Sequence, residues 1–271
     1  MASSASSDRS NPVALVTGAS SGIGEALAPC FAAAGHDLVL VARSADKLQV
    51  LARQLADEHG IKAWVEPADL AQPGAAARLV ATLRRKRRRI DVLVNNAGVL
   101  VQGPFVGMKR GEAGRMIDLN ISGLTALLDE LLPAMVARGS GRVLNVASIA
   151  AFQPVPTLAT YAATKAYVLS LTEALAEELR GSGVSVGALC PGVTATAMLD
   201  RAAARNGRLG QLPGLVVGRV EDVAAAAYRA CFDDEVVTVP GGLKQAAALA
   251  SRAAPKWLLR RLTGVLGRRV L

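Results

Sequence analysis

The chain has 271 residues, of which 51% are hydrophobic and 20% are charged, so it can bury a sizeable core as one large domain. Its three cysteines (Cys30, Cys190 and Cys231) lie far apart, which favours reduced thiols in a cytosolic protein over a disulfide framework. The only histidines are His36 and His59, and neither lies in a cluster of metal-binding residue types, which argues against a metal site.

The net charge of +9 comes from two local features of the sequence. The run "RRKRRR" (84–89) contributes +6, the stretch 252–271 contributes another +6 without an acid, and the remainder carries −3. The fold itself is therefore not a polycation. This distribution argues against a general nucleic-acid-binding protein.

The two ends of the chain differ in composition from its middle. Residues 1–11, which begin "MASSASSDRS", are expected to form a disordered tail that lacks the apolar segment of a signal peptide and the arginines of a transit peptide. No stretch reaches the length of about eighteen consecutive apolar residues that a transmembrane helix needs. The sequence thus predicts a cytoplasmic protein with a single domain over 12–242 and a basic amphipathic C-terminal extension over 243–271.

Short apolar runs rich in valine and leucine alternate with helical patterns along the middle of the chain. The predicted strands are 13–18, 36–43, 61–70, 90–98, 141–148, 184–192 and 235–242. Apolar strands separated by helices are typical of a parallel sheet covered on both faces, with right-handed crossovers. The predicted fold class is therefore α/β, a Rossmann-type doubly wound parallel sheet of about seven strands, which binds ligands at the carboxyl ends of its strands.

The stretch "TGASSGIG" (17–24) joins the first predicted strand to the first predicted helix. Gly18 permits the turn, Gly22 lets the backbone approach a phosphate, and Gly24 lets the helix pack on the strand. The helix N-terminus then offers free N–H groups and a positive dipole end to an anion. Although the spacing differs from the general dinucleotide motif, its position predicts a site for a cofactor pyrophosphate. Pro29 is expected to kink the same helix beyond its phosphate-binding turn.

The end of the second predicted strand indicates which nicotinamide cofactor is bound. An acid there would accept hydrogen bonds from the ribose hydroxyls of NAD, whereas an arginine would suit the 2′-phosphate of NADP. The strand ends at Arg43, without an acid, and Ser44 follows. A guanidinium is always cationic and offers planar donors to phosphate oxygens, so NADP(H) is favoured over NAD(H). A solvated strand-end arginine is the alternative.

The stretch "YAATK" (161–165) places a phenol and an ammonium four residues apart in a predicted helix, so Tyr161 and Lys165 share one face. Hydride transfer needs a group that exchanges a proton with the substrate oxygen, and a tyrosine with a pKa of about 10 is a poor base near neutrality. We expect the ammonium, assisted by an oxidised nicotinamide, to lower the pKa of Tyr161 toward working pH. Ser148, at the end of the fifth predicted strand, can hydrogen-bond the same substrate oxygen.

Together these motifs resemble the short-chain dehydrogenase/reductase family from about residue 12 to residue 242. The residues that carry the resemblance are "TGASSGIG", Asp69, "NNAG" (95–98), Asn120, Ser148, Tyr161 with Lys165, and "PGVTAT" (191–196). The resemblance implies a single-domain oxidoreductase that uses NAD(P)(H), acts on an alcohol or a ketone, and forms a homodimer or homotetramer.

The resemblance also implies a catalytic set of Asn120, Ser148, Tyr161 and Lys165. Lys165 would also hold the nicotinamide ribose, and Asn120 would support a water that links Lys165 to solvent. As alternatives, Ser148 could merely end a strand and Asn120 could cap or bend its helix.

The same resemblance implies a set of cofactor contacts. In chain order they are Gly18, Ser20, Ser21, Gly22, Ile23, Gly24, Arg43, Ser44, Asp69, Leu70, Asn96, Ala97, Gly98, Tyr161, Lys165, Pro191, Gly192, Val193 and Thr194. Asp69 would face the adenine ring, Asn96 and Ala97 the adenosine side, and Val193 or Thr194 the nicotinamide amide. The glycine loop departs from the family by lacking a basic residue, which leaves Arg43 to bear the 2′-phosphate with help only from Ser20, Ser44 or Lys47.

Both basic segments are open to more than one interpretation. Residues 84–89 end a predicted helix, where cations suit the negative end of the helix dipole, so a solvated helix end is favoured over an acidic partner or nucleic acid. In 255–271, Trp257 and several leucines form one helical stripe with arginines around it. Such a helix either packs on its own domain or a second subunit, or makes a peripheral contact with a membrane.

Substrate selectivity is expected to lie in residues 196–217, which have glycine at several points and are predicted to form a mobile lid. Met198, Leu199, Leu212 and Leu215 indicate an apolar pocket. The sequence thus predicts an NADP(H)-dependent carbonyl reductase or alcohol dehydrogenase for a small, apolar substrate. The alternatives are an NAD-dependent alcohol dehydrogenase of the same fold and a non-catalytic, cofactor-sensing protein, which would not need the catalytic tyrosine.

Overall fold

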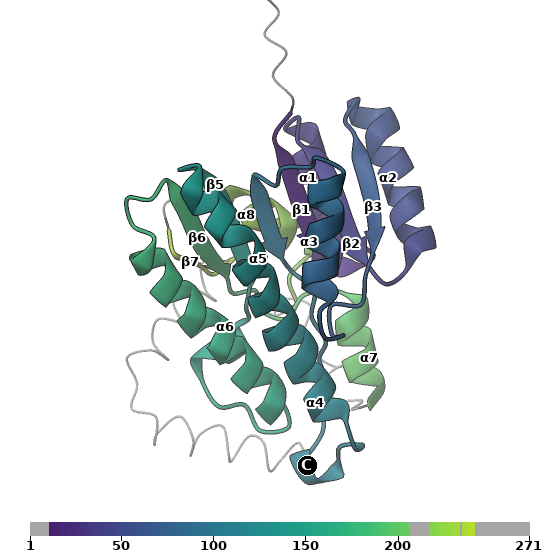
Figure 1. Cartoon of the computed structure of the whole chain (residues 1–271). Coiled ribbons are helices and arrows are strands. Elements are labelled where there is room, and N and C mark those ends of the chain that lie inside the picture. Colours follow the sequence, from purple (N-terminus) through teal and green to yellow (C-terminus); the bar gives the residue numbers. More distant parts are fainter. Residues whose placement is uncertain (1–10, 206–216, 234, 242–271) are drawn as a thin grey trace, which may run out of the picture.

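The computed structural model describes residues 11–205, 217–233 and 235–241, and Figure 1 shows a sheet with helices packed on its two faces. The expectations for the N-terminal tail up to residue 10, for Leu212 and Leu215, and for the C-terminal extension concern residues outside these ranges. Asn11, which the sequence places in the tail, donates a hydrogen bond from Nδ2 to Oδ1 of Asp37 over 3.1 Å.

The strands form one parallel sheet in the order β3-β2-β1-β4-β5-β6-β7. They are β1 (Val13–Thr17), β2 (Asp37–Ala42), β3 (Ala63–Pro67), β4 (Val92–Asn95), β5 (Gly141–Val146), β6 (Val184–Leu189) and β7 (Val237–Thr238). β1 pairs in parallel with both β2 and β4, so the winding direction of the chain reverses between β1 and β4. The predicted doubly wound parallel sheet is confirmed, and a ligand is expected beyond the carboxyl ends of these two strands.

The helices connect the strands in the alternation that the sequence predicts. They are α1 (Gly22–Ala33), α2 (Ala45–His59), α3 (Ala75–Arg85), α4 (Glu112–Ile117), α5 (Leu124–Ala137), α6 (Ala159–Glu178), α7 (Ala197–Arg205) and α8 (Val220–Ala230), with short helical turns at η1 (Phe105–Gly107), η2 (Asp118–Gly123) and η3 (Ile149–Phe152). Pro29 lies inside α1, and the helix continues past it to Ala33.

Alternate residues of each strand point to opposite faces of the sheet and build two separate cores. On β1, Leu15 packs in a core with α3, α5 and α6, whereas Val16 packs in a core with α1, α2 and α8. Figure 1 shows the first group of helices lying together in front of the sheet. Both faces are therefore covered, which explains why the strands read as apolar runs rather than as alternating patterns.

The helical stretch Glu112–Ala137 is long and apolar enough, by length and composition alone, to cross a membrane, with a mean hydropathy of 1.3. The same test is passed by helices in the cores of globular domains. Leu127, Leu131 and Met135 of this stretch are buried in the core that the sheet forms with α3, α5 and α6. Part of its apolar composition is thus accounted for by packing within the domain.

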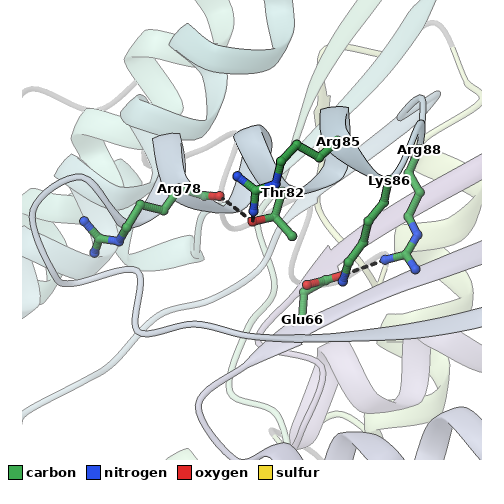
Figure 2. A network of polar contacts seen from close by, with 6 residues as sticks. All are labelled: Glu66, Arg78, Thr82, Arg85, Lys86 and Arg88. Atoms are coloured by element: carbon green, nitrogen blue, oxygen red, sulfur yellow. Dashed lines mark hydrogen bonds and ion pairs between the residues drawn. The ribbon is translucent and has the colours of Figure 1, made fainter.

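The basic run 84–89 begins in the last turn of α3 and is tied to the neighbouring strand β3. Glu66 of β3 accepts hydrogen bonds at Oε1 from Lys86 Nζ, at 2.6 Å, and from the Arg88 guanidinium. Arg88 also lies over the indole ring of Trp64, 4.4 Å from its centroid. Figure 2 shows Lys86 and Arg88 both directed at Glu66. The Glu66 carboxylate, whose side chain is 10% exposed, thus has two cationic partners.

Other members of the run contact acids on further elements. Arg84 lies 3.5 Å from a carboxylate oxygen of Glu130 on α5, and Arg89 lies 3.0 Å from one of Asp91. The run lies at a helix end and all of its members except Arg88 are exposed, as expected for a solvated helix end. The run also forms ion pairs with acids on β3, on α5 and just before β4.

The first prediction tests the Glu66 network. Glu66→Gln should lower the free energy of unfolding by about 1–3 kcal/mol, because Arg88 stays largely buried beside Lys86 without a compensating charge. Urea unfolding of both proteins measures the difference.

The matched control is Glu177→Gln, which removes an acid from the exposed pair of Glu177 with Arg180. Exposed pairs are screened by water and salt, so this change should leave the unfolding curve unmoved. Equal curves for the Glu66 variant and the wild type would show that the network is not stabilising.

Candidate active site

A cleft of about 570 Å³ lies at the carboxyl ends of the central strands. It is lined by the glycine loop, by the turns after β2, β3 and β4, by the residues after β5 and β6, and by the first turns of α6 and α7. Every residue that the sequence assigns to the site lines this cleft except Gly24 and Asn120. The residues that the sequence assigns to the site come from segments far apart along the chain, and in the structure they form one continuous surface.

The glycine loop adopts the conformation that its glycines permit. Gly18 and Gly22 have φ angles of +68° and +61°, which other residues rarely adopt. A Cβ atom on Gly24 would lie only 2.6 Å from the carbonyl oxygen of Gly18, so the missing side chain lets α1 pack against the loop. Ser21 caps α1 without a side-chain hydrogen bond, so the first N–H groups of this helix are left for an anion such as a pyrophosphate.

Asn96 links the glycine loop to the turn after β4. Its Nδ2 donates to the carbonyl oxygen of Thr17 over 2.8 Å, and the backbone N–H groups of Asn96 and Ala97 both donate to Thr17 Oγ1, over 2.9 and 3.0 Å. The Thr17 hydroxyl in turn donates to the carbonyl oxygen of Val94. The Asn96 side chain, expected to face the cofactor's adenosine side, is thus engaged in holding two cleft walls together.

Polar and cationic side chains gather where β2 ends. Arg43 follows the strand, and its exposed side chain forms no ion pair within the part of the chain that the structure describes. Ser44 begins α2 without a side-chain capping bond, and Ser20 and Lys47 line the same part of the cleft. A guanidinium, an ammonium and hydroxyl groups suit a phosphate monoester at this position.

Asp69 lies at the cleft wall after β3 and is held from two sides. Its Oδ1 accepts a hydrogen bond from the backbone N–H of Ala71 over 3.2 Å, and its Oδ2 lies 3.8 Å from the guanidinium of Arg115. These contacts fix the carboxylate at the turn, where the backbone beside it also lines the cleft. The placement is compatible with the adenine-side position that the family resemblance implies.

The opposite end of the cleft holds Ser148, Tyr161 and Lys165. α6 carries Tyr161 and Lys165 on one face, and these side chains are 9% and 5% exposed. The Lys165 ammonium donates to the carbonyl oxygen of Val146 on β5 over 2.7 Å and lies 5.8 Å from the centroid of the Tyr161 ring. Ser148 follows β5 and accepts a hydrogen bond at Oγ from the backbone N–H of Ala150.

Burial governs the proton affinities of this group. It raises the pKa of Tyr161, with hydrogen bonding to Ser148 acting in the opposite direction. It also lowers the pKa of Lys165 to about 8, against a smaller effect of Cys190. Among the protein's own groups Lys165 does not lower the pKa of Tyr161, because the phenol lies in a dry environment and the ammonium is aimed at a backbone carbonyl. The lowering expected with an oxidised nicotinamide stays a prediction.

Asn120 lies in η2, a π-helical turn between α4 and α5, just behind the cleft. Its Nδ2 donates to the carbonyl oxygen of Val99 and to Thr164 Oγ1, and its Oδ1 accepts from the backbone N–H of Val99. A Cβ atom on Gly98 would lie 3.2 Å from Asn120 Oδ1 and 3.6 Å from Lys165 Nζ. Asn120 therefore ties the segment after β4 to α6 close to the ammonium, and it also lies where the helix is irregular.

The structure adds residues that the sequence did not reveal. The additional cleft-lining residues near Tyr161 are Leu100, Gln102, Leu119, Ile149, Ala150, Gln153, Val155 and Leu158. Most of them lie on irregular segments, where neither period 2 nor period 3.6 indicates which side chains turn inward. Met198 and Leu199, expected to face the substrate, do line the cleft.

Comparison with known proteins gives a consistent result. Residues 12–207 match the family model of short chain dehydrogenases. Oxidoreductase UcpA of Escherichia coli K12 is 37% identical over 194 residues, which cover 71% of this chain and 73% of that protein.

Solved structures are similar over most of their length. A short-chain dehydrogenase from Sphingobium yanoikuyae in complex with NADPH has 38% sequence identity and a TM-score of 0.78, over 89% of this chain and 93% of that one. The bulky-bulky ketone specific alcohol dehydrogenase from Comamonas testosteroni has 33% identity and a TM-score of 0.75, over 92% and 96% of the two chains. Since the family model spans most of the described sheet and the relatives share about a third of their residues with it, this chain belongs to the short-chain dehydrogenase/reductase family and is an NAD(P)-dependent oxidoreductase acting on CH–OH groups.

Proposed function

We propose that the protein interconverts a ketone and a secondary alcohol with NADP(H), and that Tyr161 exchanges the proton with the substrate oxygen. The observation that carries the proposal is the burial of Tyr161 beside Ser148 and Lys165 at one end of a cleft whose other end suits a phosphorylated nucleotide. A bound nicotinamide would supply or accept the hydride. The protein's own residues would bind both partners, exclude water and move the proton.

In the reductive direction, Tyr161 acts as the proton donor. A phenol that stays protonated at neutral pH can donate its proton to a carbonyl oxygen as that oxygen gains charge. Ser148 can donate a second hydrogen bond to the same oxygen. Lys165, with Asn120 near its ammonium, lies where it can stabilise negative charge left on the phenol. An NAD-dependent enzyme working in the oxidative direction is the second candidate.

The preference for NADP(H) is supported by Arg43 and by the polar residues around it, Ser20, Ser44 and Lys47. No acid at the end of β2 competes for the ribose hydroxyls. The NADPH bound to the Sphingobium enzyme supports the same assignment by similarity.

The substrate is expected to have a largely apolar body. Leu100, Val155, Leu158, Met198 and Leu199 line the cleft, and the first three also pack in the small core that contains Tyr161. The name of the Comamonas relative, which describes a preference for bulky ketones, supports a substrate of this kind.

We also propose a cytoplasmic homo-oligomer. Cys30, Cys190 and Cys231, all within the described residues, form no disulfide. Ile117 of α4, Val136 of α5 and Tyr167 of α6 are each more than a third exposed, so these helices offer apolar area to a second subunit.

The proton-transfer role is tested with Tyr161→Phe. Turnover should fall by at least about 100-fold, because the proton donor is lost, while NADPH affinity should remain nearly unchanged. Steady-state kinetics and cofactor titration measure the two quantities.

Tyr167→Phe is the matched control, because Tyr167 lies on the same helix but outside the cleft and bonds to Thr125. This variant should keep wild-type turnover. Retention of more than a few per cent of activity in the Tyr161 variant would refute the assignment.

The cofactor preference is tested with Arg43→Ala. NADPH affinity should fall by about 10- to 100-fold, the equivalent of a lost charge-assisted hydrogen bond, while NADH affinity should change little. Fluorescence titration with each cofactor measures the dissociation constants. Arg53→Ala, a change at an exposed arginine of α2 outside the cleft, serves as the control. An equal loss for both cofactors would remove Arg43 as the discriminator.

The burial of Lys165 predicts a pH-dependent effect on stability. The folded-state pKa of about 8 lies below the ordinary value of 10.5, so burying the ammonium costs stability fully below pH 8 and progressively less as pH rises toward 10.5. Lys165→Met should therefore raise the unfolding free energy near pH 7 by roughly 1–3 kcal/mol while abolishing turnover. The stability difference should shrink above pH 8.

Denaturation of the wild type and the variant across pH 7 to 10 measures this difference. Lys62→Met, a change at an exposed lysine, should show no such dependence on pH. A gap between wild type and the Lys165 variant that stays constant with pH would contradict the depressed pKa.

A further inference from the structure

Gln102 has a buried amide that the proposed chemistry does not use. The residue is 7% exposed, it lines the cleft, and its Oε1 has no hydrogen-bond partner among the described residues. Buried side-chain oxygens are nearly always partnered, since an unpaired one loses its hydration without compensation. The position of Gln102 therefore points to a partner that arrives from the cleft.

The other unpartnered buried polar atoms lie elsewhere. They are His36 Nδ1, Asn95 Oδ1 and Arg138 Nε, and none of these residues lines the cleft. Gln102 thus differs from them in facing a cavity large enough for a ligand. An unpaired amide oxygen that was only a tolerated packing defect would have no reason to lie at the cleft.

Gln102 lies at the catalytic end of the cleft, not at the cofactor's phosphate end. Leu100 and Val101, which precede it, pack with Val155 and Leu158 in the small core that contains Tyr161. The backbone N–H of Gly103, which follows it, donates to the carbonyl oxygen of Thr157 over 2.9 Å. The segment is thereby fixed to the loop that leads into α6.

The backbone around this link is held in uncommon conformations. Thr157 has a φ of +67°, although it is not a glycine, and Gly103 has a φ of +145°. Such conformations persist where the surrounding structure determines them, and they occur most often at binding sites. The link thus holds Gln102 at a defined position beside the space for the substrate body.

We propose that Gln102 recognises a hydroxyl group of the substrate that is separate from the reacting carbonyl. The substrate class is then an apolar ketone that carries a second hydroxyl. A hydroxyl both donates and accepts, so it can pair with either end of the carboxamide, whichever faces the ligand. The apolar residues around Gln102 accommodate the hydrocarbon part. This inference rests on the proposed ketone reduction.

A polar group of this kind produces strong discrimination. A site built to hydrogen-bond a substrate hydroxyl disfavours the analogue that lacks it, because the buried amide is then left unpaired. The effect is larger than an apolar pocket achieves by size alone. Gln102 is thereby a specificity-determining residue, and it takes no part in proton transfer.

The test compares decalone with a panel of decalones that carry one hydroxyl at different positions. The wild type should reduce at least one hydroxylated decalone with a kcat/KM more than about tenfold above that of decalone. Gln102→Met should remove this preference, so that the hydroxylated decalone and decalone are reduced with similar kcat/KM. Gln102→Leu gives a second apolar variant should the first fold poorly.

Gln153→Met is the matched control, because Gln153 lines the same cleft without a buried unpartnered atom. Whatever its effect on the overall rate, this variant should keep the preference for the hydroxylated ketone. Two results would overturn the assignment to Gln102. One is loss of the preference in Gln153→Met as well as in Gln102→Met, and the other is survival of the preference in both Gln102→Met and Gln102→Leu.

Thermal unfolding separates this inference from the proposed reaction. Gln102→Met should raise the Tm of the protein alone, because an unpaired buried amide is removed, and the hydroxylated decalone should raise the Tm of the wild type more than that of the variant. If the wild type reduces no ketone, the proposed function fails, and the hydroxyl-dependent Tm shift still decides whether Gln102 binds the hydroxyl. A Tm shift equal in wild type and variant would overturn the inference.

Discussion

The burial of the Lys165 ammonium is the constraint around which the catalytic end of the cleft is organised. The ammonium is tolerated because β5 supplies the carbonyl oxygen of Val146, and because Gly98 has no side chain to occupy the adjacent space. The arrangement still costs stability, as the lowered pKa of the ammonium shows. Two apolar cores, one on each face of the sheet, offset this cost. The site therefore lowers the stability of the fold, and the packing of the rest of the domain compensates, as is common where function requires a buried charge.

The nucleotide end of the cleft is held together by hydrogen bonds between neutral groups. They lie between β1 and β4, where the winding direction of the chain reverses. The Thr17 hydroxyl receives two backbone N–H groups from the turn after β4, and Asn96 binds back to the carbonyl oxygen of Thr17. The glycine loop and this turn consequently form one surface. A change in either would displace the other, because Gly18 and Gly24 leave no space for a side chain beside Asn96.

Features that depend on interactions between residues close in sequence could be predicted, and features that depend on contacts between distant segments could not. The sheet and the shared face of Tyr161 and Lys165 depend on local periodicity, so both could be predicted. The raised pKa of Tyr161 depends on burial by segments distant in sequence, and the pairing of Arg88 with Glu66 is equally long-range. The last strand, expected over 235–242, is reduced to Val237–Thr238, and among the described strands only β6 pairs with it. Gln102 carried no sequence signal because it lies in a loop.

The two ends of the cleft are built by different means, and this difference separates cofactor binding from substrate choice. The nucleotide end uses strand ends, a helix N-terminus and glycines, which are fixed by the architecture of the sheet. The catalytic end adds the irregular segments after β4 and β5, joined by the hydrogen bond between Gly103 and Thr157. Substitutions of side chains in those segments that face the cleft, such as Gln102, can change the pocket while α6 keeps Tyr161 and Lys165 in the core. Selectivity can thus vary on a constant catalytic frame, and Gln102 is positioned where such variation has its effect.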